Sequence, residues 1–92
     1  MVLSKEQSEK VKQLSLQLVE YEQQDWYCEG TDWENGVPCF CIFSNTFDVY
    51  AVADWNENIL VGFDLPMDIL LTIKKIVKIE AKIYHIIYDR QV

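Results

Sequence analysis

The middle of this 92-residue chain contains no positively charged side chain. Between Gln13 and Ile73 there is neither Lys nor Arg, and all eight basic residues lie nearer the two ends. Because roughly one residue in ten is basic in an average protein, a gap of this length is improbable as a chance event. A protein that binds the phosphates of nucleic acid needs a basic patch. The gap therefore predicts that the chain does not bind nucleic acid directly.

The sequence also lacks the signals of a membrane or secreted protein. Its longest apolar candidate, residues 69–87, is broken by five charged side chains and does not reach the roughly 18 residues of a membrane span. The first residues contain no apolar core of signal-peptide length. Three cysteines, an odd number, argue against a disulfide framework. We expect reduced thiols, no membrane contact and a cytoplasmic location.

Signatures of catalysis are missing as well. The sequence contains no Gly-x-Ser-x-Gly, no Walker loop and no His-Glu-x-x-His, and His85 is its only histidine. Paired carboxylates with Trp platforms could serve glycosidic acid–base chemistry, but no local motif distinguishes any pair here. A domain of this size also has little room for both a core and a deep pocket. The sequence predicts a protein that is not an enzyme and needs no cofactor.

Metal sites are not predicted either. Cys28, Cys39, Cys41 and His85 are four residues of the two types that most often bind zinc, but the paired knuckles of a zinc site are absent. Cysteines that alternate along an apolar strand are more simply core residues. The acidic turns at residues 32–36 and 54–58 do not match the twelve-residue calcium loop.

What fills the basic-free stretch is negative charge and tryptophan. It holds eleven carboxylates, and each of the three tryptophans follows an aspartate within it. Those carboxylates are Glu20, Glu22, Asp25, Glu29, Asp32, Glu34, Asp48, Asp54, Glu57, Asp64 and Asp68. A sustained negative field beside large aromatic side chains is typical of a surface that captures a cationic partner. The alternative is that the tryptophans fill the core and the aspartates are solvated turn residues.

The hydrophobic pattern predicts one domain, residues 1–92, that begins with a helix. Ser4 and Gln7 have the spacing of a capping box, and apolar residues then recur every three or four positions, which predicts a helix over about residues 4–24. Residues 25–38 are rich in turn formers, with at most a short strand at 26–29. Alternating apolar residues predict strands at 37–43, 47–55 and 59–63, joined by short turns as an antiparallel meander.

The last segment permits two interpretations. As a helix from about Pro66 to Asp89 it gathers its lysines and His85 on one polar face, but it places Glu80 on the apolar face. As a strand over residues 77–83 it alternates without conflict. Because no Gly, Pro or Asn offers a break, we favour the helix. The fold class is therefore α+β: an N-terminal helix, a three- to four-stranded antiparallel meander and a C-terminal helix, with a further strand near the end as the alternative.

In size and charge the chain resembles small acidic inhibitors, namely immunity proteins that neutralise basic toxin domains and phage proteins that block nucleic-acid-handling enzymes. The resemblance transfers no site. It implies an inhibitor or immunity-type protein that occludes a basic site, such as that of a toxin nuclease. We assign partner contact first to Asp25, Trp26, Glu29, Asp32, Trp33 and Glu34, and second to Asp48, Asp54 and Glu57.

Among the tryptophans, we expect Trp55 in the core and at least one of Trp26 and Trp33 in reach of solvent. The competing function is a structural or homo-oligomeric module, such as a homodimer, that would use strand edges or the isoleucine-rich C-terminal segment. In that case the carboxylates would only keep the protein in solution.

Overall fold

The computed structural model describes residues 3–34 and 37–88, which form one sheet and two helices. The elements follow in the order α1 (Lys5–Glu22), β1 (Tyr27–Glu34), β2 (Val37–Ser44), β3 (Val49–Asp54), β4 (Ile59–Val61) and α2 (Met67–Tyr88). All neighbouring strands are antiparallel, and their order in the sheet is β1-β2-β3-β4. The predicted α+β arrangement is confirmed.

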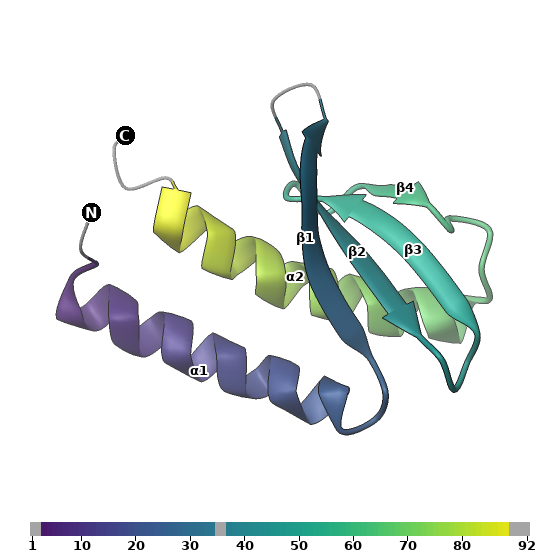
Figure 1. The fold of residues 1–92 in the computed structure, drawn as a ribbon, viewed down its shortest axis with the longest axis horizontal. Coiled ribbons are helices and arrows are strands. Elements are labelled where there is room, and N and C mark those ends of the chain that lie inside the picture. The colour runs from purple at the N-terminus through teal and green to yellow at the C-terminus, as the bar shows by residue number, and fades with distance from the viewer. Residues whose placement is uncertain (1–2, 35–36, 89–92) are drawn as a thin grey trace.

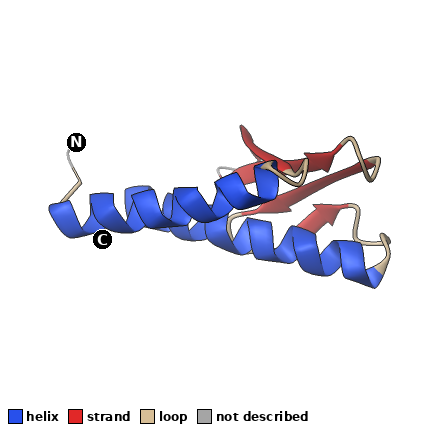
Figure 2. Cartoon of the chain, turned by 90° about the horizontal axis from the view of Figure 1, so that it is seen from below, coloured by secondary structure: helices blue, strands red, loops and turns tan. Residues whose placement is uncertain are grey.

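The molecule has two layers. Both helices lie on one side of the sheet, and they run in opposite directions beside each other (Figures 1 and 2). Helix α2 contacts β1, β2 and β3, whereas α1 packs mainly against α2. Among the described residues, no helix is both long enough and apolar enough to cross a membrane.

The start of α1 is fixed by its predicted capping box. Ser4 Oγ accepts a hydrogen bond from the Gln7 backbone N–H at 3.1 Å, and Gln7 Oε1 accepts one from the Ser4 N–H at 2.9 Å. Two amide groups that the helix leaves without intrahelical partners are thereby satisfied. Leu14 is the buried residue of α1, because only one stripe of this helix meets α2.

The C-terminal segment is a helix, as the favoured interpretation predicts. Glu80 is the residue that this interpretation places on the apolar face. The long apolar face of the helix is buried through Ile73, Ile76 and Val77, which the sheet covers. Glu80 faces Cys28 of β1, whose thiol donates a hydrogen bond to the carboxylate. A polar partner at the edge of the sheet makes the half-buried position tolerable.

Strand β1 is longer than the predicted short strand at 26–29. It runs to Glu34 and pairs with β2 from Tyr27 opposite Phe43 to Glu34 opposite Val37, with an irregularity after Thr31. Gly30 does not form a turn but lies opposite Phe40. A Cβ at this position would lie 2.6 Å from Tyr84 Oη, so glycine makes room for the tyrosine of α2.

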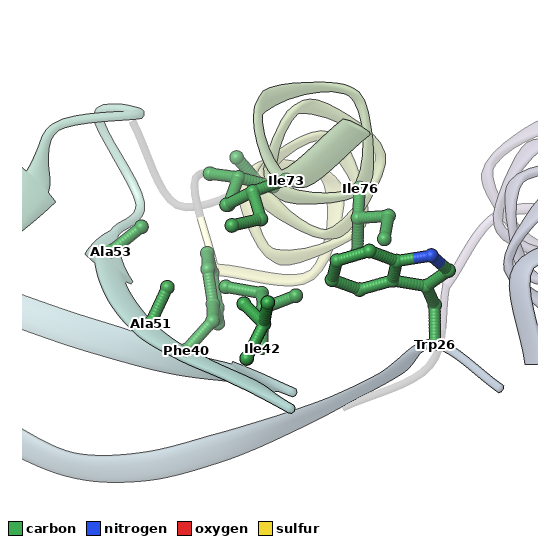
Figure 3. Close-up of a cluster of buried hydrophobic side chains, with 10 residues drawn as sticks. Trp26, Phe40, Ile42, Ala51, Ala53, Ile73 and Ile76 are labelled. Carbon is green, nitrogen blue, oxygen red and sulfur yellow. The ribbon is translucent and has the colours of Figure 1, made fainter. Parts of the chain in front are cut away.

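The core lies between the sheet and α2, as Figure 3 shows. Phe40 and Ile42 of β2 are fully buried against the helix layer, and Ala51 and Ala53 of β3 continue this face, as the alternation in residues 47–55 predicts. Trp26 closes one end of the cluster near Ile76 (Figure 3). The cysteines of β2 point to the opposite face, so the core face of β2 is the one that carries Phe40, not the one that carries Cys39.

Two predicted strands are shorter than the pattern suggests. Residues 45–48 form the β2–β3 turn, so β3 begins at Val49 instead of residue 47. Asp48 has a φ of 52° there, and Ser44 Oγ accepts a hydrogen bond from the Phe47 N–H at 3.3 Å. Strand β4 ends at Val61 because Gly62, with a φ of 93°, turns the chain.

Candidate functional site

The face of the sheet that points away from the helices forms a coherent surface, which we call the outer face. Strand alternation and the pairing register place its residues in three rows across the strands. They are Tyr27, Phe43 and Tyr50 in the first row, Glu29, Cys41, Val52 and Val61 in the second, and Cys39 and Asp54 in the third. None of the elements in residues 3–34 and 37–88 covers this face (Figure 2).

The first row is aromatic. The rings of Tyr27 and Phe43 stack with centroids 5.4 Å apart and an interplanar angle of 27°, and Tyr50 is the cross-strand partner of Phe43 on the other side. Tyr50 is 59% exposed and Tyr27 is 36% exposed, so ring surface is open to solvent. Exposed ring faces of this kind attract ammonium and guanidinium groups through their quadrupole.

Two buried thiols lie next to the aromatic row on the outer face. Cys41 and Cys39 lie on the outer face but are buried. A hydrogen bond with Cys41, together with the thiol's charge when ionised, raises the pKa of Tyr50. Tyr50 therefore stays neutral at physiological pH and presents its ring, not a phenolate, to a partner.

Carboxylates border the aromatic row. Glu29 is exposed in the middle of β1 and lies across from Cys41. At the end of the row the charge of Asp25 raises the pKa of Tyr27, which places a carboxylate close to that phenol. The outer face therefore combines open aromatic rings with negative charge, the pair of features that a cationic side chain needs.

Asp25 also stabilises the fold, because its hydrogen bonds link two turns. It has a φ of 68° in the turn before β1, a conformation that aspartate tolerates better than most residues. One of its carboxylate oxygens accepts hydrogen bonds from the Thr46 N–H at 2.6 Å and from Thr46 Oγ1 at 2.7 Å. These bonds lower the pKa of Asp25 and tie the α1–β1 turn to the β2–β3 turn.

Asp48 and Glu57 are turn residues, and Asp54 is the last residue of β3, where it holds the β3–β4 turn. Asp54 Oδ1 accepts hydrogen bonds from the backbone N–H groups of Asn56 and Asn58, each at 2.9 Å, and Asp54 Oδ2 accepts one from Asn58 Nδ2 at 3.0 Å. Glu57 and Asp48 both have positive φ and are exposed. In a meander the β3–β4 turn and the β2–β3 turn lie at opposite ends of the sheet, so Asp54 and Glu57 do not gather with Asp48.

The burial of the tryptophans differs in part from the prediction. Trp26, a predicted contact residue, is only 3% exposed and stacks on Phe47 with centroids 5.5 Å apart, so its indole belongs to the core. Trp55 is partly buried against the core, as expected. Its ring stacks on His85 at 4.6 Å, and His85 Nε2 lies 3.2 Å from the Trp55 carbonyl oxygen. The histidine is half-buried there, not exposed among lysines.

Three further predicted contact residues lie at the far end of β1. The backbone of Asp32, Trp33 and Glu34 is part of that strand. The side chains of residues 31–36 lie outside the described part of the chain. Whether Trp33 is in reach of solvent therefore stays a prediction.

The three thiols do not converge. Cys28 points to the core face and meets Glu80, whereas Cys39 and Cys41 lie on the outer face. Burial, with Glu80 as the second cause, raises the pKa of the Cys28 thiol far above its usual value, so it stays protonated. All three cysteines are free, and within residues 3–34 and 37–88 no three metal-ligating side chains are grouped to hold an ion.

Charge is divided between the two layers. The turns and strands from Asp25 to Asp64 carry eight carboxylates and no Lys or Arg. The helices and chain ends carry the other seven carboxylates and all eight basic residues. The sheet layer thus has a net charge of −8 and the rest of the chain +1, which together give the −7 of the whole. The segments that form the sheet and its turns therefore carry the negative charge of the molecule.

Sequence reasoning missed the aromatic row. Tyr27, Phe43 and Tyr50 were not among the predicted contact residues, although Tyr50 falls on the non-core face of an alternating strand. An aromatic residue at a solvent-facing strand position is the signal that identifies such a surface.

Comparisons with protein-family models, with curated proteins and with solved structures find no match.

Proposed function

We propose that this is a non-enzymatic binding protein of the cytoplasm whose outer face docks on a basic site of a partner protein. In this role it is an inhibitor of the immunity type, which occludes a cleft that a toxin nuclease or another nucleic-acid-handling enzyme uses for its polyanionic substrate. The observation that carries the proposal is the layer division of charge: the uncovered face belongs to the layer with eight carboxylates and no base.

The chemistry of contact follows from the first and second rows. A partner Lys or Arg can lie over the open ring of Tyr27 while its charge pairs with Glu29, and a second cationic side chain can lie over Tyr50. Cation–π contacts contribute about 0.5–2 kcal/mol each, more where water is excluded. Val52 and Val61 extend the surface with apolar area, as the centre of a protein interface requires.

The predicted contact set changes accordingly. Glu29 stays in it, and Asp25 contributes charge at the end of the row while it holds the turn. Trp26 leaves the set because its indole is buried. Tyr27, Phe43 and Tyr50 take over as the aromatic anchors.

Capture from cell lysate with charge-matched baits tests the proposal. The baits are the wild type, Glu29→Lys on the outer face and Glu9→Lys on an exposed position of α1, so both variants change the net charge equally. We expect the wild type and Glu9→Lys to retain a basic nucleic-acid-handling protein at low salt and to release it as salt rises. Glu29→Lys should bind it at least about tenfold more weakly, because close charge pairs at interfaces contribute about 1.5 kcal/mol or more.

Two results would count against the proposal. If Glu29→Lys retains the same proteins as the wild type, the outer face is not the contact. If Glu9→Lys loses the partner to the same extent as Glu29→Lys, the binding responds to net charge alone and no specific face is involved.

A further inference from the structure

Large apolar side chains are exposed together at one flank of the molecule, where β4 meets the start of α2. They are Leu60, Phe63, Met67 and Leu71, and we call them the β4 flank. Their exposed fractions range from 43% for Leu60 to 71% for Phe63. Single exposed apolar residues are ordinary on a protein surface, but a group of four at one edge marks an interaction site.

The β4 flank is continuous across both layers. Phe63 lines a hollow of about 300 Å³ with Ile59 from the sheet and with Leu70 and Lys74 from α2. Met67 and Leu71 extend the same face of α2, because residues three, four and seven positions apart lie side by side on a helix. Figure 1 shows α1 and β4 on opposite sides of α2, so α1 leaves this side of α2 open.

Strand β4 itself is a poor template for another strand. It has three residues, and its register with β3 shifts between Val61 opposite Val52 and Ile59 opposite Ala53. Short length and a bulge are the devices by which proteins prevent edge-to-edge strand addition. A partner therefore meets this flank through side chains and not by extension of the sheet.

The charges along α2 indicate what that partner is. Asp64 lies just before the helix, and Lys74 and Lys78 follow on its open side. A two-fold axis perpendicular to α2 makes the helices of two copies antiparallel, which places Asp64 of each copy near the lysines of the other. We infer that the β4 flank binds a second copy of this chain in a symmetric dimer, with its apolar side chains at the centre and Asp–Lys contacts at the rim.

The dimer has a consequence for the outer face, which rests on the proposed function. A two-fold axis perpendicular to the sheet places both outer faces on the same side of the dimer. A partner with two basic sites, or a repeated one, would then meet both faces at once and bind more tightly than to a single copy.

The oligomeric state tests the inference. Light scattering after size exclusion should give a mass that rises with concentration from 10.9 kDa towards twice that value. Met67→Glu and Leu71→Glu place like charges at the centre of the interface and should return the monomer. Both side chains are exposed, so the thermal melting temperature of the monomer should change little. The control is Leu16→Glu, at a 58% exposed position of α1, which should leave the dimer intact.

The inference is overturned if the wild type remains at the monomer mass at about 100 μM, a concentration that populates dimers with micromolar dissociation constants. It is also overturned if the flank variants stay dimeric, or if Leu16→Glu alone dissociates the dimer. Should one flank variant fail to fold, the other decides. Glu29→Lys should not change the mass, which separates a failure of the dimer from a failure of the proposed function.

Discussion

At the scale of single residues, the indole of Trp26 serves stability instead of recognition. It is buried between Phe47 and the core cluster, so its removal leaves a cavity that the fixed sheet and α2 cannot close. We expect Trp26→Ala to lower the free energy of unfolding by about 3–5 kcal/mol. Urea denaturation followed by circular dichroism measures the change. Tyr50→Ala, at an exposed ring, should cost far less, and equal losses in the two variants would contradict the assignment.

Asp25 should give the stability a dependence on acid pH. Its folded pKa is lowered, chiefly by the hydrogen bonds from Thr46, so its stabilising contribution is present above the unfolded pKa. That contribution is lost as the pH falls below about 4, through the folded pKa. Asp25→Asn keeps an acceptor and tolerates the positive φ, but it does not titrate. Wild type and variant should therefore converge in stability as the pH falls, and a constant difference between pH 7 and pH 3 would refute this role.

The residue scale is also where sequence reasoning was least able to assign roles. Asp25-Trp26 and Asp54-Trp55 look alike as dipeptides, yet the hydrogen bonds of Asp25 go to Thr46, across the sheet end, and those of Asp54 go to its own turn. The burial of Trp26 depends on Phe47, more than twenty positions along the chain. Contacts of that separation leave no local pattern, so composition could predict a negative aromatic region but not which rings are exposed.

At the scale of elements, α2 contains a carboxylate that weakens the fold at neutral pH. Burial raises the pKa of Glu80, with the Cys28 thiol opposing this in part. A carboxyl group with a raised folded pKa stabilises the fold below its unfolded pKa and loses that contribution as the pH rises through the folded pKa. We expect Glu80→Gln to unfold at higher urea concentration than the wild type at pH 7 and at the same concentration near pH 4. Glu9→Gln, at an exposed position of α1, should show no such difference.

The contact between β1 and α2 at Gly30 offers a second test at this scale. A methyl group on Gly30 would meet Tyr84 Oη, whose ring is held by an edge contact with Phe40 at 4.8 Å. Gly30→Ala should therefore destabilise the wild type but not the Tyr84→Phe variant, which lacks the hydroxyl. A double-mutant cycle measured by denaturation should give a coupling energy of about 1 kcal/mol. Additive effects would show that Tyr84 is free to move away.

Elements with a local signal could be predicted from the sequence. The capping box at Ser4 set the start of α1, and alternation in residues 47–55 gave the core face of β3. The extent of β1 could not be predicted, because its turn-forming residues are held in a strand by pairing with β2 and by the space that Tyr84 needs at Gly30. The sequence could not decide between helix and strand for α2, because only a helix places Glu80 on the apolar face. The polar partner that Glu80 finds there is Cys28, which lies on a strand far away in the sequence.

At the scale of the whole molecule, the separation of charge by layer links sequence to function. Most of the basic-free stretch forms the sheet and its turns, with residues 13–22 in α1 and 67–73 in α2, while the lysines lie on the helices. An asymmetric field of this kind orients a protein as it approaches a basic partner and speeds encounter, an effect that salt weakens. The outer face is the uncovered surface of the negative layer (Figure 2). A basic partner that this field attracts would therefore meet the aromatic row.

The most direct test is to map the contact on the folded protein by amide chemical shifts. Isotope-labelled protein would be titrated with the captured basic partner, or with a short arginine-rich peptide, at low salt. The account predicts the largest changes at residues 27–30, 39–43 and 49–52, the strands that carry the aromatic row, and little change along α1. Changes confined to the helices, or spread evenly over all carboxylate-bearing segments, would contradict the claim that the outer face is the binding surface.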